Sequence, residues 1–205
     1  MLFDWDGTLV DSAEVSYRCF LRLFESFGLP FDRQSFARTY SPNWIRTYEA
    51  MGLPRSDWPE ADARWVGHYQ EERSALLPGA AESLAMLRER GKGRGLVTSG
   101  DRSRVRGELE RFGLDGIFGA VVCGQDVRQR KPHPEGLLLA LEQMGVAGDE
   151  AAYVGDSPED MGMAQAAGVF SVGVPGGFPN REALVASKPD LMVATLAEAV
   201  EELLR

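Results

Sequence analysis

The sequence has few of the residues on which disulfide-rich and zinc-binding proteins depend. Only two cysteines occur among its 205 residues, Cys19 and Cys123, and they lie far apart in different kinds of segment. This excludes a disulfide framework or a cysteine zinc site and favours a reducing compartment. We expect both thiols to be small core residues. The only histidines, His68 and His133, have no nucleophile paired with them, so we expect surface or packing roles for both.

Long apolar runs and an excess of basic residues are also missing. No stretch approaches the roughly 18 apolar residues of a membrane helix, and the first residues do not resemble a signal peptide. The 22 Lys and Arg residues are outnumbered by 31 Asp and Glu residues, which gives a formal net charge of −9. Nucleic acids and anionic membranes attract basic surfaces, so we expect neither as a partner. We expect a cytoplasmic protein that attracts an anionic substrate only through local positive groups.

What the sequence does contain is a helical stretch placed inside an alternating pattern. From residue 78 onward, short apolar runs alternate with amphipathic helices, which is typical of a Rossmann-like α/β fold with a parallel sheet and helices on both faces. Residues 12–77 contain only helical patterns. We therefore predict an α/β core from residues 1–11 and 78–205, and an inserted all-helical cap at 12–77. Its expected helical stretches are 16–27, 32–51 and 58–75, with loops around "SPN" and "GLPRSDWP".

Polar residues follow the apolar runs at the points where the strands should end. In a parallel sheet these carboxyl ends share one edge, and ligands bind in the crevice there. We therefore expect four separate clusters to converge on one crevice. They are Asp4 and Asp6 after the first run, Thr98 and Ser99 after "GLV", Lys131 in the loop beyond "VVCG", and Asp156 after "YVG".

The paired aspartates indicate a bound cation, because two adjacent carboxylates repel each other. Mg²⁺ prefers oxygen ligands and usually takes only one or two protein carboxylates. Asp4 and Asp156 can supply them, together with the backbone carbonyl of Asp6. Asp4 can then attack phosphorus to form an aspartyl phosphate, and Asp6 can act as general acid and then as general base.

The other two clusters fit phosphoryl transfer. Lys131 offers a positive charge to the phosphoryl oxygens, and Thr98 and Ser99 offer a hydroxyl and a backbone N–H. Gly7 leaves room for the backbone to approach the phosphate closely.

The segments "DWDGTLVDS", "LVTSG", "RKPHP" and "GDSPED" resemble, in sequential order, the four motifs of the haloacid dehalogenase superfamily of phosphatases. The helical insertion resembles the cap of the phosphoglycolate phosphatase-like branch. The resemblance implies Asp4 as nucleophile, Asp6 as acid/base, Thr98 as phosphate binder, Lys131 as charge clamp and Asp156 as metal ligand.

The resemblance also leaves some positions open. It implies that Asp160 contacts the metal only indirectly, through a residue that binds the metal or through a water molecule. An acidic residue there also suits the first turn of a helix. Ser99 stands where relatives often have an amide. Only three residues precede Asp4, so the first strand is expected to be short. Arg38 and Arg46 could hold a substrate carboxylate or a second phosphate, but surface positions are the commoner outcome for such residues.

These patterns predict a magnesium-dependent phosphatase acting on a small phosphorylated metabolite, with phosphoglycolate as the substrate suggested by the branch. A phosphosugar mutase on the same scaffold is the nearest alternative. A phospho-accepting receiver domain also combines Asp, Thr, Lys and magnesium, but it has no helical cap. A dehalogenase needs neither the magnesium carboxylates nor an acid at Asp6, and a silent binding protein does not explain the full set of catalytic residue types. The sequence does not indicate the oligomeric state.

Overall fold

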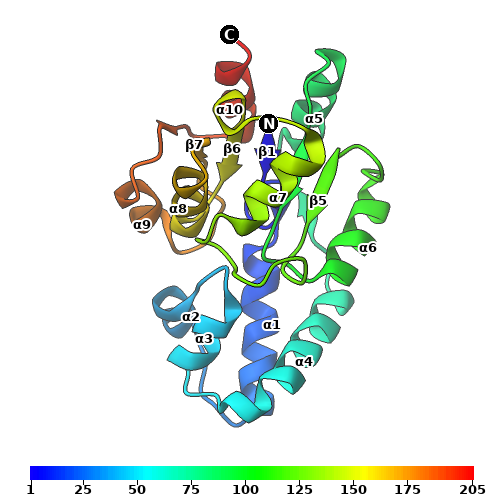
Figure 1. The fold of residues 1–205 in the computed structure, drawn as a ribbon. Coiled ribbons are helices and arrows are strands. Elements are labelled where there is room, and N and C mark those ends of the chain that lie inside the picture. The colour runs from blue at the N-terminus through cyan, green and yellow to red at the C-terminus, as the bar shows by residue number, and fades with distance from the viewer.

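A six-stranded parallel sheet forms the centre of the structure, a computed structural model that describes residues 1–205. Its strands are β1 (Leu2–Phe3), β4 (Gly95–Val97), β5 (Ala120–Val122), β6 (Ala152–Gly155), β7 (Phe170–Gly173) and β8 (Leu191–Met192), while β2 (Val10–Asp11) and β3 (Ala75–Leu76) form a separate pair. The sheet has the order β5-β4-β1-β6-β7-β8, so the chain winds outward from β1 in one direction and then in the other (Figure 1). The predicted α/β fold is confirmed.

Helices cover both faces of this sheet. The helices of the core are α5 (Ala80–Glu89), α6 (Arg102–Phe112), α7 (Glu135–Met144), α8 (Pro158–Ala166), α9 (Arg181–Ala186) and α10 (Leu196–Leu203). Four more helices precede them in the chain: α1 (Ala13–Ser26), α2 (Arg33–Thr39), α3 (Trp44–Ala50) and α4 (Trp58–Glu71). Buried side chains of α5, α6 and α10 share one apolar cluster with the sheet, and those of α7 and α8 share another. Because both faces are covered, the strands of this sheet are mostly apolar, with Ser171 of β7 as a buried polar residue.

The central strand β1 is only two residues long, as its sequence predicted, and its neighbours hold it on both sides. Leu2 is paired with Gly95 of β4 and with Tyr153 of β6. The ladder continues past the strand, because the backbone N–H of Asp4 donates to the carbonyl of Val154 at 2.9 Å. The position of Asp4 is therefore fixed by the sheet itself.

Local signals in the sequence explain where several helices begin and end. The Asp101 carboxylate accepts a hydrogen bond from the Arg104 N–H and caps α6, and Gly113 ends that helix in a left-handed conformation. Thr195 caps α10 through the N–H of Glu198. Both cysteines are buried, free and distant from any disulfide partner.

The all-helical prediction for residues 12–77 was wrong at its end, where β3 pairs antiparallel with β2. The helical stretch over 32–51 is divided into α2 and α3 by the loop expected around "SPN", since Pro42 lacks an N–H and disfavours helical geometry at the residue before it. The expected helix over 58–75 ends at Glu71, and β8 was not predicted. Two-residue strands are too short to show a period in the sequence.

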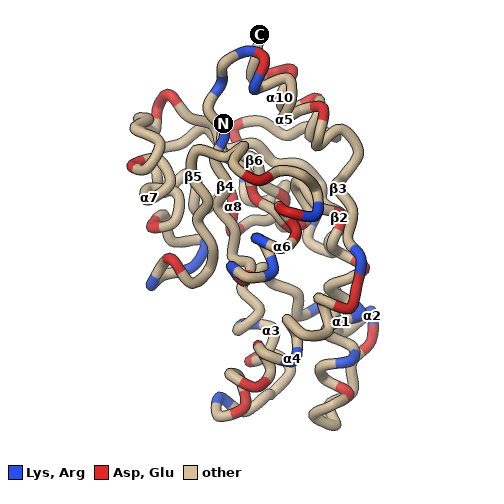
Figure 2. The backbone as a smooth tube through the Cα atoms, turned by 90° about the vertical axis from the view of Figure 1, so that its right-hand side faces the viewer, with Lys and Arg blue, Asp and Glu red and all other residues tan.

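Helices α1 to α4 project from the carboxyl end of the sheet, and both chain termini lie at the opposite end (Figure 1). Helices α1 to α4 share an apolar cluster that is rich in aromatic side chains. Phe178, from the loop after β7, also belongs to this cluster. Acidic and basic residues are interspersed along the whole backbone (Figure 2). No helix combines the length and the apolar character that crossing a membrane requires.

Candidate active site

The carboxyl ends of β1, β4 and β6 bring the predicted residues together. Asp4 follows β1, Thr98 follows β4 and Asp156 follows β6, and the three strands are adjacent and parallel. All three residues are buried, with Asp4 at 5% exposed and Asp156 at 2%. The crevice predicted from the strand pattern therefore exists, and it lies where α1 to α4 meet the sheet.

The turn that follows Asp4 depends on glycine. The Trp5 carbonyl accepts hydrogen bonds from the backbone N–H groups of Leu9 at 3.0 Å and Val10 at 2.9 Å. Gly7 has a φ of 80°, and a Cβ added there would lie 2.2 Å from Oδ2 of Asp156. A larger residue at this position would both strain the backbone and displace a carboxylate of the site.

The Lys131 ammonium lies at the centre of the buried charges. Its Nζ donates to Oδ1 of Asp4 at 2.6 Å, to Oδ1 of Asp160 at 2.7 Å and to the hydroxyl of Tyr153 at 2.7 Å. Burial alone would lower the pKa of Lys131, but Asp160 and Asp4 outweigh it and hold that pKa above its ordinary value. The lysine is therefore charged, and its position is fixed by three partners.

The acidic residues exceed this single cation and form a suitable pocket for a metal ion. One carboxylate oxygen from each of Asp4, Asp156 and Asp160 lies within 4.8 Å of the others, and Oδ2 of Asp156 is buried without a hydrogen-bond partner. Burial raises the pKa of Asp4 to about 7, against the opposing effect of Lys131, and it raises the pKa of Asp156 well above its usual range. A set of oxygen ligands with uncompensated negative charge fits Mg²⁺.

Asp160 has other partners in addition to this cluster. Its Oδ2 accepts hydrogen bonds from the backbone N–H and the hydroxyl of Ser157, which completes a capping box at the start of α8. Its Oδ1 accepts from Lys131. Both interpretations drawn from the sequence, a helix-cap role and a supporting role beside the metal site, are thus compatible with its contacts.

Thr98 and Ser99 lie beside Asp4, at the end of β4. The Thr98 hydroxyl oxygen accepts from the backbone N–H of Gly100 at 3.0 Å, while the Ser99 hydroxyl is buried without a partner. Both residues line the same cavity as Asp4 and Asp6. An oxyanion placed there would find hydroxyl donors that the protein leaves free.

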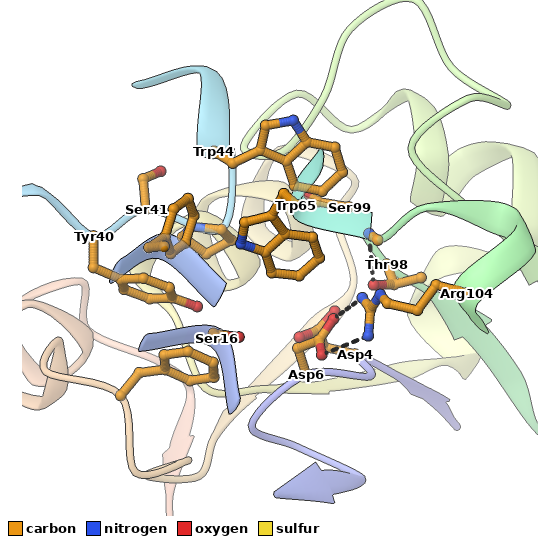
Figure 3. A pocket seen from close by; sticks show the side chains of 14 residues that line it. Asp4, Asp6, Ser16, Tyr40, Ser41, Trp44, Trp65, Thr98, Ser99 and Arg104 are labelled. Carbon is orange, nitrogen blue, oxygen red and sulfur yellow. Dashed lines mark hydrogen bonds and ion pairs between the residues drawn. The ribbon is translucent and has the colours of Figure 1, made fainter. Parts of the chain in front are cut away.

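Arg104 is a residue of this site that the sequence analysis did not identify. Its guanidinium forks onto the Asp6 carboxylate, with Nη1 3.0 Å from Oδ1 and Nη2 2.5 Å from Oδ2 (Figure 3). The Arg104 side chain is only 2% exposed and is also paired with Glu108, one turn further along α6. The one available signal was this charged pair at i, i+4 beside the apolar positions Val105 and Leu109.

Aromatic side chains from α1 to α4 close the cavity above the carboxylates. Tyr40, Trp44 and Trp65 lie across it from Arg104 (Figure 3), and Phe178 stacks on Tyr40 with ring centroids 4.3 Å apart. Burial raises the pKa of Tyr40 well above its usual value, so its hydroxyl stays protonated. The cavity measures about 40 Å³, room for about three water molecules.

The two arginines considered as substrate contacts do not line this cavity. Arg38 is exposed at the end of α2. Arg46 is 56% exposed, and its Nη1 lies 3.7 Å from Oε1 of Glu159 at the start of α8. The structure therefore does not bring either arginine together with the other predicted residues.

Comparison with known proteins agrees with this geometry. A family model described as "haloacid dehalogenase-like hydrolase" matches residues 1–174. Proteins named phosphoglycolate phosphatase from Shigella sonnei (strain Ss046) and Escherichia coli (strain K12) are each 32% identical over 228 residues, covering 98% of this chain and 90% of the relative.

Solved structures share the architecture. CbbY from Rhodobacter sphaeroides in complex with phosphate is 28% identical with a TM-score of 0.80, covering 96% of this chain and 94% of CbbY. A variant of CbbY was solved with xylulose-(1,5)bisphosphate. A hydrolase from Pseudomonas syringae, 21% identical with a TM-score of 0.88 over 98% of this chain and 96% of its own, shares the fold.

Proposed function

Because the chain belongs to the haloacid dehalogenase-like hydrolase family, we propose that it is a magnesium-dependent enzyme that hydrolyses a small phosphate ester through an aspartyl-phosphate intermediate. The relatives named phosphoglycolate phosphatase identify the chain as a phosphoric monoester hydrolase of this family. The metal dependence, the intermediate and the roles of the residues are the new parts of the proposal.

One observation carries the proposal: the buried contact between Asp4 and Lys131 at the carboxyl edge of the sheet, with Asp156 beside it. The Lys131 ammonium lies 2.6 Å from Oδ1 of Asp4, so a phosphoryl group brought to Asp4 would meet a fixed positive charge. An ion pair that only stabilised the fold would not require a further buried carboxylate beside it. Asp156 is such a carboxylate, and its Oδ2 has no hydrogen-bond partner. This surplus of carboxylate suits a site that binds a divalent ion together with an anionic substrate.

In the first step, a carboxylate oxygen of Asp4 attacks phosphorus and the ester oxygen leaves. Asp4, Asp156 and the backbone carbonyl of Asp6 would hold the magnesium ion, which when bound neutralises the carboxylates and polarises the phosphoryl oxygens. Lys131 and the Thr98 hydroxyl stabilise the negative charge on the transferring group, and Ser99 offers its backbone N–H. Gly7 leaves space for the phosphate next to the backbone.

Asp6 serves both halves of the reaction. It donates a proton to the departing ester oxygen and then accepts one from the water that hydrolyses the aspartyl phosphate, so one carboxyl group returns to its starting state at each turnover. Asp6 is 21% exposed in its side chain and lines the cavity, which gives it access to both the leaving group and water.

The substrate enters beneath α1 to α4, which we propose act as a cap. The relatives' names make phosphoglycolate the first ester to test, and the sugar bisphosphate bound by CbbY makes sugar phosphates the second. Arg38 and Arg46 remain predictions for a second acidic group, since neither lines the cavity in this arrangement.

The experiment that tests the proposal measures phosphate release from a panel of phosphorylated metabolites. Asp4→Asn should lower kcat by roughly a thousandfold or more, because an amide is a poor nucleophile, while the exposed Asp11→Asn should leave kcat unchanged. EDTA should stop turnover, and Mg²⁺ should restore it. Turnover by Asp4→Asn at the wild-type rate, or full activity in EDTA, would refute the mechanism.

A further inference from the structure

A buried network of charges connects Asp6 to the helices above the sheet. Its first part is the two-point contact between the Arg104 guanidinium and both carboxylate oxygens of Asp6. A guanidinium fork fixes the plane of a carboxylate, which a single hydrogen bond cannot do. Each oxygen retains a further lone pair, so Asp6 can still face the cavity and exchange a proton there.

Glu108 is the second part of the network and holds Arg104 in place. Its Oε2 accepts hydrogen bonds from Nη1 of Arg104 at 3.0 Å and from the indole N–H of Trp5 at 2.8 Å. Trp5 lies between Asp4 and Asp6 in the chain, so Glu108 contacts both the arginine that holds Asp6 and the residue that precedes it. This carboxylate is 6% exposed and is engaged on both oxygens.

The other oxygen of Glu108 faces the segment that returns from α4 to the sheet. Oε1 accepts from the hydroxyl of Tyr69 at 3.1 Å and from the hydroxyl of Ser74 at 2.5 Å. The Arg104 guanidinium carbon also lies 4.5 Å from the centre of the Tyr69 ring. The same two charged side chains thus contact the catalytic turn, the end of α4 and the return segment.

Fold stability alone does not require this arrangement. Buried ion pairs lose most of their Coulomb energy to desolvation, and apolar side chains of similar size often replace them without loss. Removing one member of the network would destabilise the fold, because it would leave a buried charge unpaired. The network ends on Asp6, which lines the reaction cavity. Its geometry instead suits the requirement that a general acid be held in one orientation.

We propose that Arg104 is a positioning residue for Asp6, and that Glu108 orients Arg104 and couples it to α4 and the return segment. The inference rests on the proposed phosphatase activity and deepens it. Protonation of the leaving oxygen matters most for poor leaving groups such as alkoxides, and little for activated phenolates. Replacement of Arg104 should therefore slow the hydrolysis of alkyl phosphates more than that of activated phenyl phosphates.

The test compares Arg104→Ala, Arg104→Lys and Glu108→Gln with the control Arg106→Ala, an exposed residue on the same helix. For each variant, the rate of the first turnover is measured with an alkyl phosphate and with p-nitrophenyl phosphate, using Mg²⁺ at saturation. We expect Arg104→Ala to slow alkyl ester cleavage by about 100-fold and nitrophenolate release by less than about tenfold. Arg104→Lys should behave similarly, because an ammonium cannot bind both oxygens in a fork.

Added guanidinium ion should restore part of the alkyl ester cleavage in Arg104→Ala and none in Glu108→Gln, which still has its guanidinium. Glu108→Gln should show the same leaving-group dependence with a smaller loss. A merely structural role would slow both esters by the same factor, and that result would refute the inference while leaving the phosphatase proposal intact. Failure of the unmodified chain to release phosphate from any ester would refute both.

Discussion

At the scale of single residues, the buried carboxylates outnumber the cations that contact them. Lys131 bridges Asp4 and Asp160, while Oδ2 of Asp156 has no partner. Burial raises the pKa of Asp4 to about 7 and that of Asp156 well above its ordinary value, so without a metal the folded chain binds protons more tightly than the unfolded chain does. The stability that Asp4 contributes is fully present below its ordinary pKa of 3.8 and is lost as the pH rises through about 7, and that of Asp156 is lost in the same direction.

Magnesium should therefore stabilise the chain more at high pH than at low pH. The ion competes with protons for the same carboxylates, so we expect the rise in Tm between EDTA and Mg²⁺ to be larger at pH 8 than at pH 5. Thermal melts followed by circular dichroism measure this difference.

Asp156→Asn is the matched variant for this measurement. It removes one of the repelling charges, so its Tm in EDTA at pH 8 should exceed that of the wild type, and Mg²⁺ should no longer raise it. The exposed Asp115→Asn should behave as the wild type does. An equal magnesium effect at both pH values would contradict the proposed site.

Residues that follow strands could be placed from the sequence, and residues within helices could not. Asp4, Thr98 and Asp156 follow apolar runs, and parallel strands necessarily end at one edge, so their convergence was predictable. Arg104 occupies an ordinary position in an amphipathic helix, and its direction depends on how α6 packs against the sheet. Such packing is a property of the whole fold that a local pattern does not contain.

At the scale of elements, α6 carries Arg104 and Glu108 of the network and depends on its N-cap. The Asp101 carboxylate accepts from the Arg104 N–H at 3.0 Å and is bonded by the side chains of Ser103 and Gln125. Asp101→Ala should reduce the free energy of unfolding by about 1 kcal/mol, because it leaves backbone donors of the first turn unsatisfied. Urea unfolding measures the change.

Asp115→Ala provides the comparison, since this exposed aspartate follows the same helix and caps nothing. We expect it to change the free energy of unfolding by less than about 0.5 kcal/mol. Equal stability of the two variants would show that the cap contributes nothing to α6.

The elements that the sequence predicted correctly are those with a full period of apolar residues. The helical spacing of Phe20 and Phe24 predicted α1, and both side chains are buried. The two residues of β3 and of β8 show no period, and they became strands only because β2 and β7 lie alongside them. The break between α2 and α3 was predicted from Pro42, because proline gives a local signal that does not depend on a long apolar period.

At the scale of the whole molecule, Tyr40, Trp44 and Trp65 line the same cavity as Asp4. We therefore expect α1 to α4 to move when a substrate enters. Ser41, between α2 and α3, hydrogen-bonds Glu159 of α8 at 3.0 Å, which is a direct contact between the helices and the core. A covalent link at this point should hold the helices in place.

We expect a reducible thiol cross-linker joining Ser41→Cys to Glu159→Cys to lower the rate of phosphate release at least tenfold. Reduction of the linker should restore the rate. Cys19 and Cys123 are buried and should not react, and each single variant treated with the same reagent controls for modification alone. Full activity of the linked protein would show that substrate access requires no movement of the helices.

The strand pair β2 and β3 carries the chain out of the core and back again, with Val10 opposite Leu76 and Asp11 opposite Ala75. Because the chain leaves the core along β2 and returns along the adjacent β3, the residues between them impose no requirement on the order of strands in the sheet. We therefore predict that a different helical module could be grafted between these two points, provided that it kept the contacts of Tyr69 and Ser74 with Glu108. Exchange of this one segment should then change the choice of ester while the residues at the strand ends stay in place.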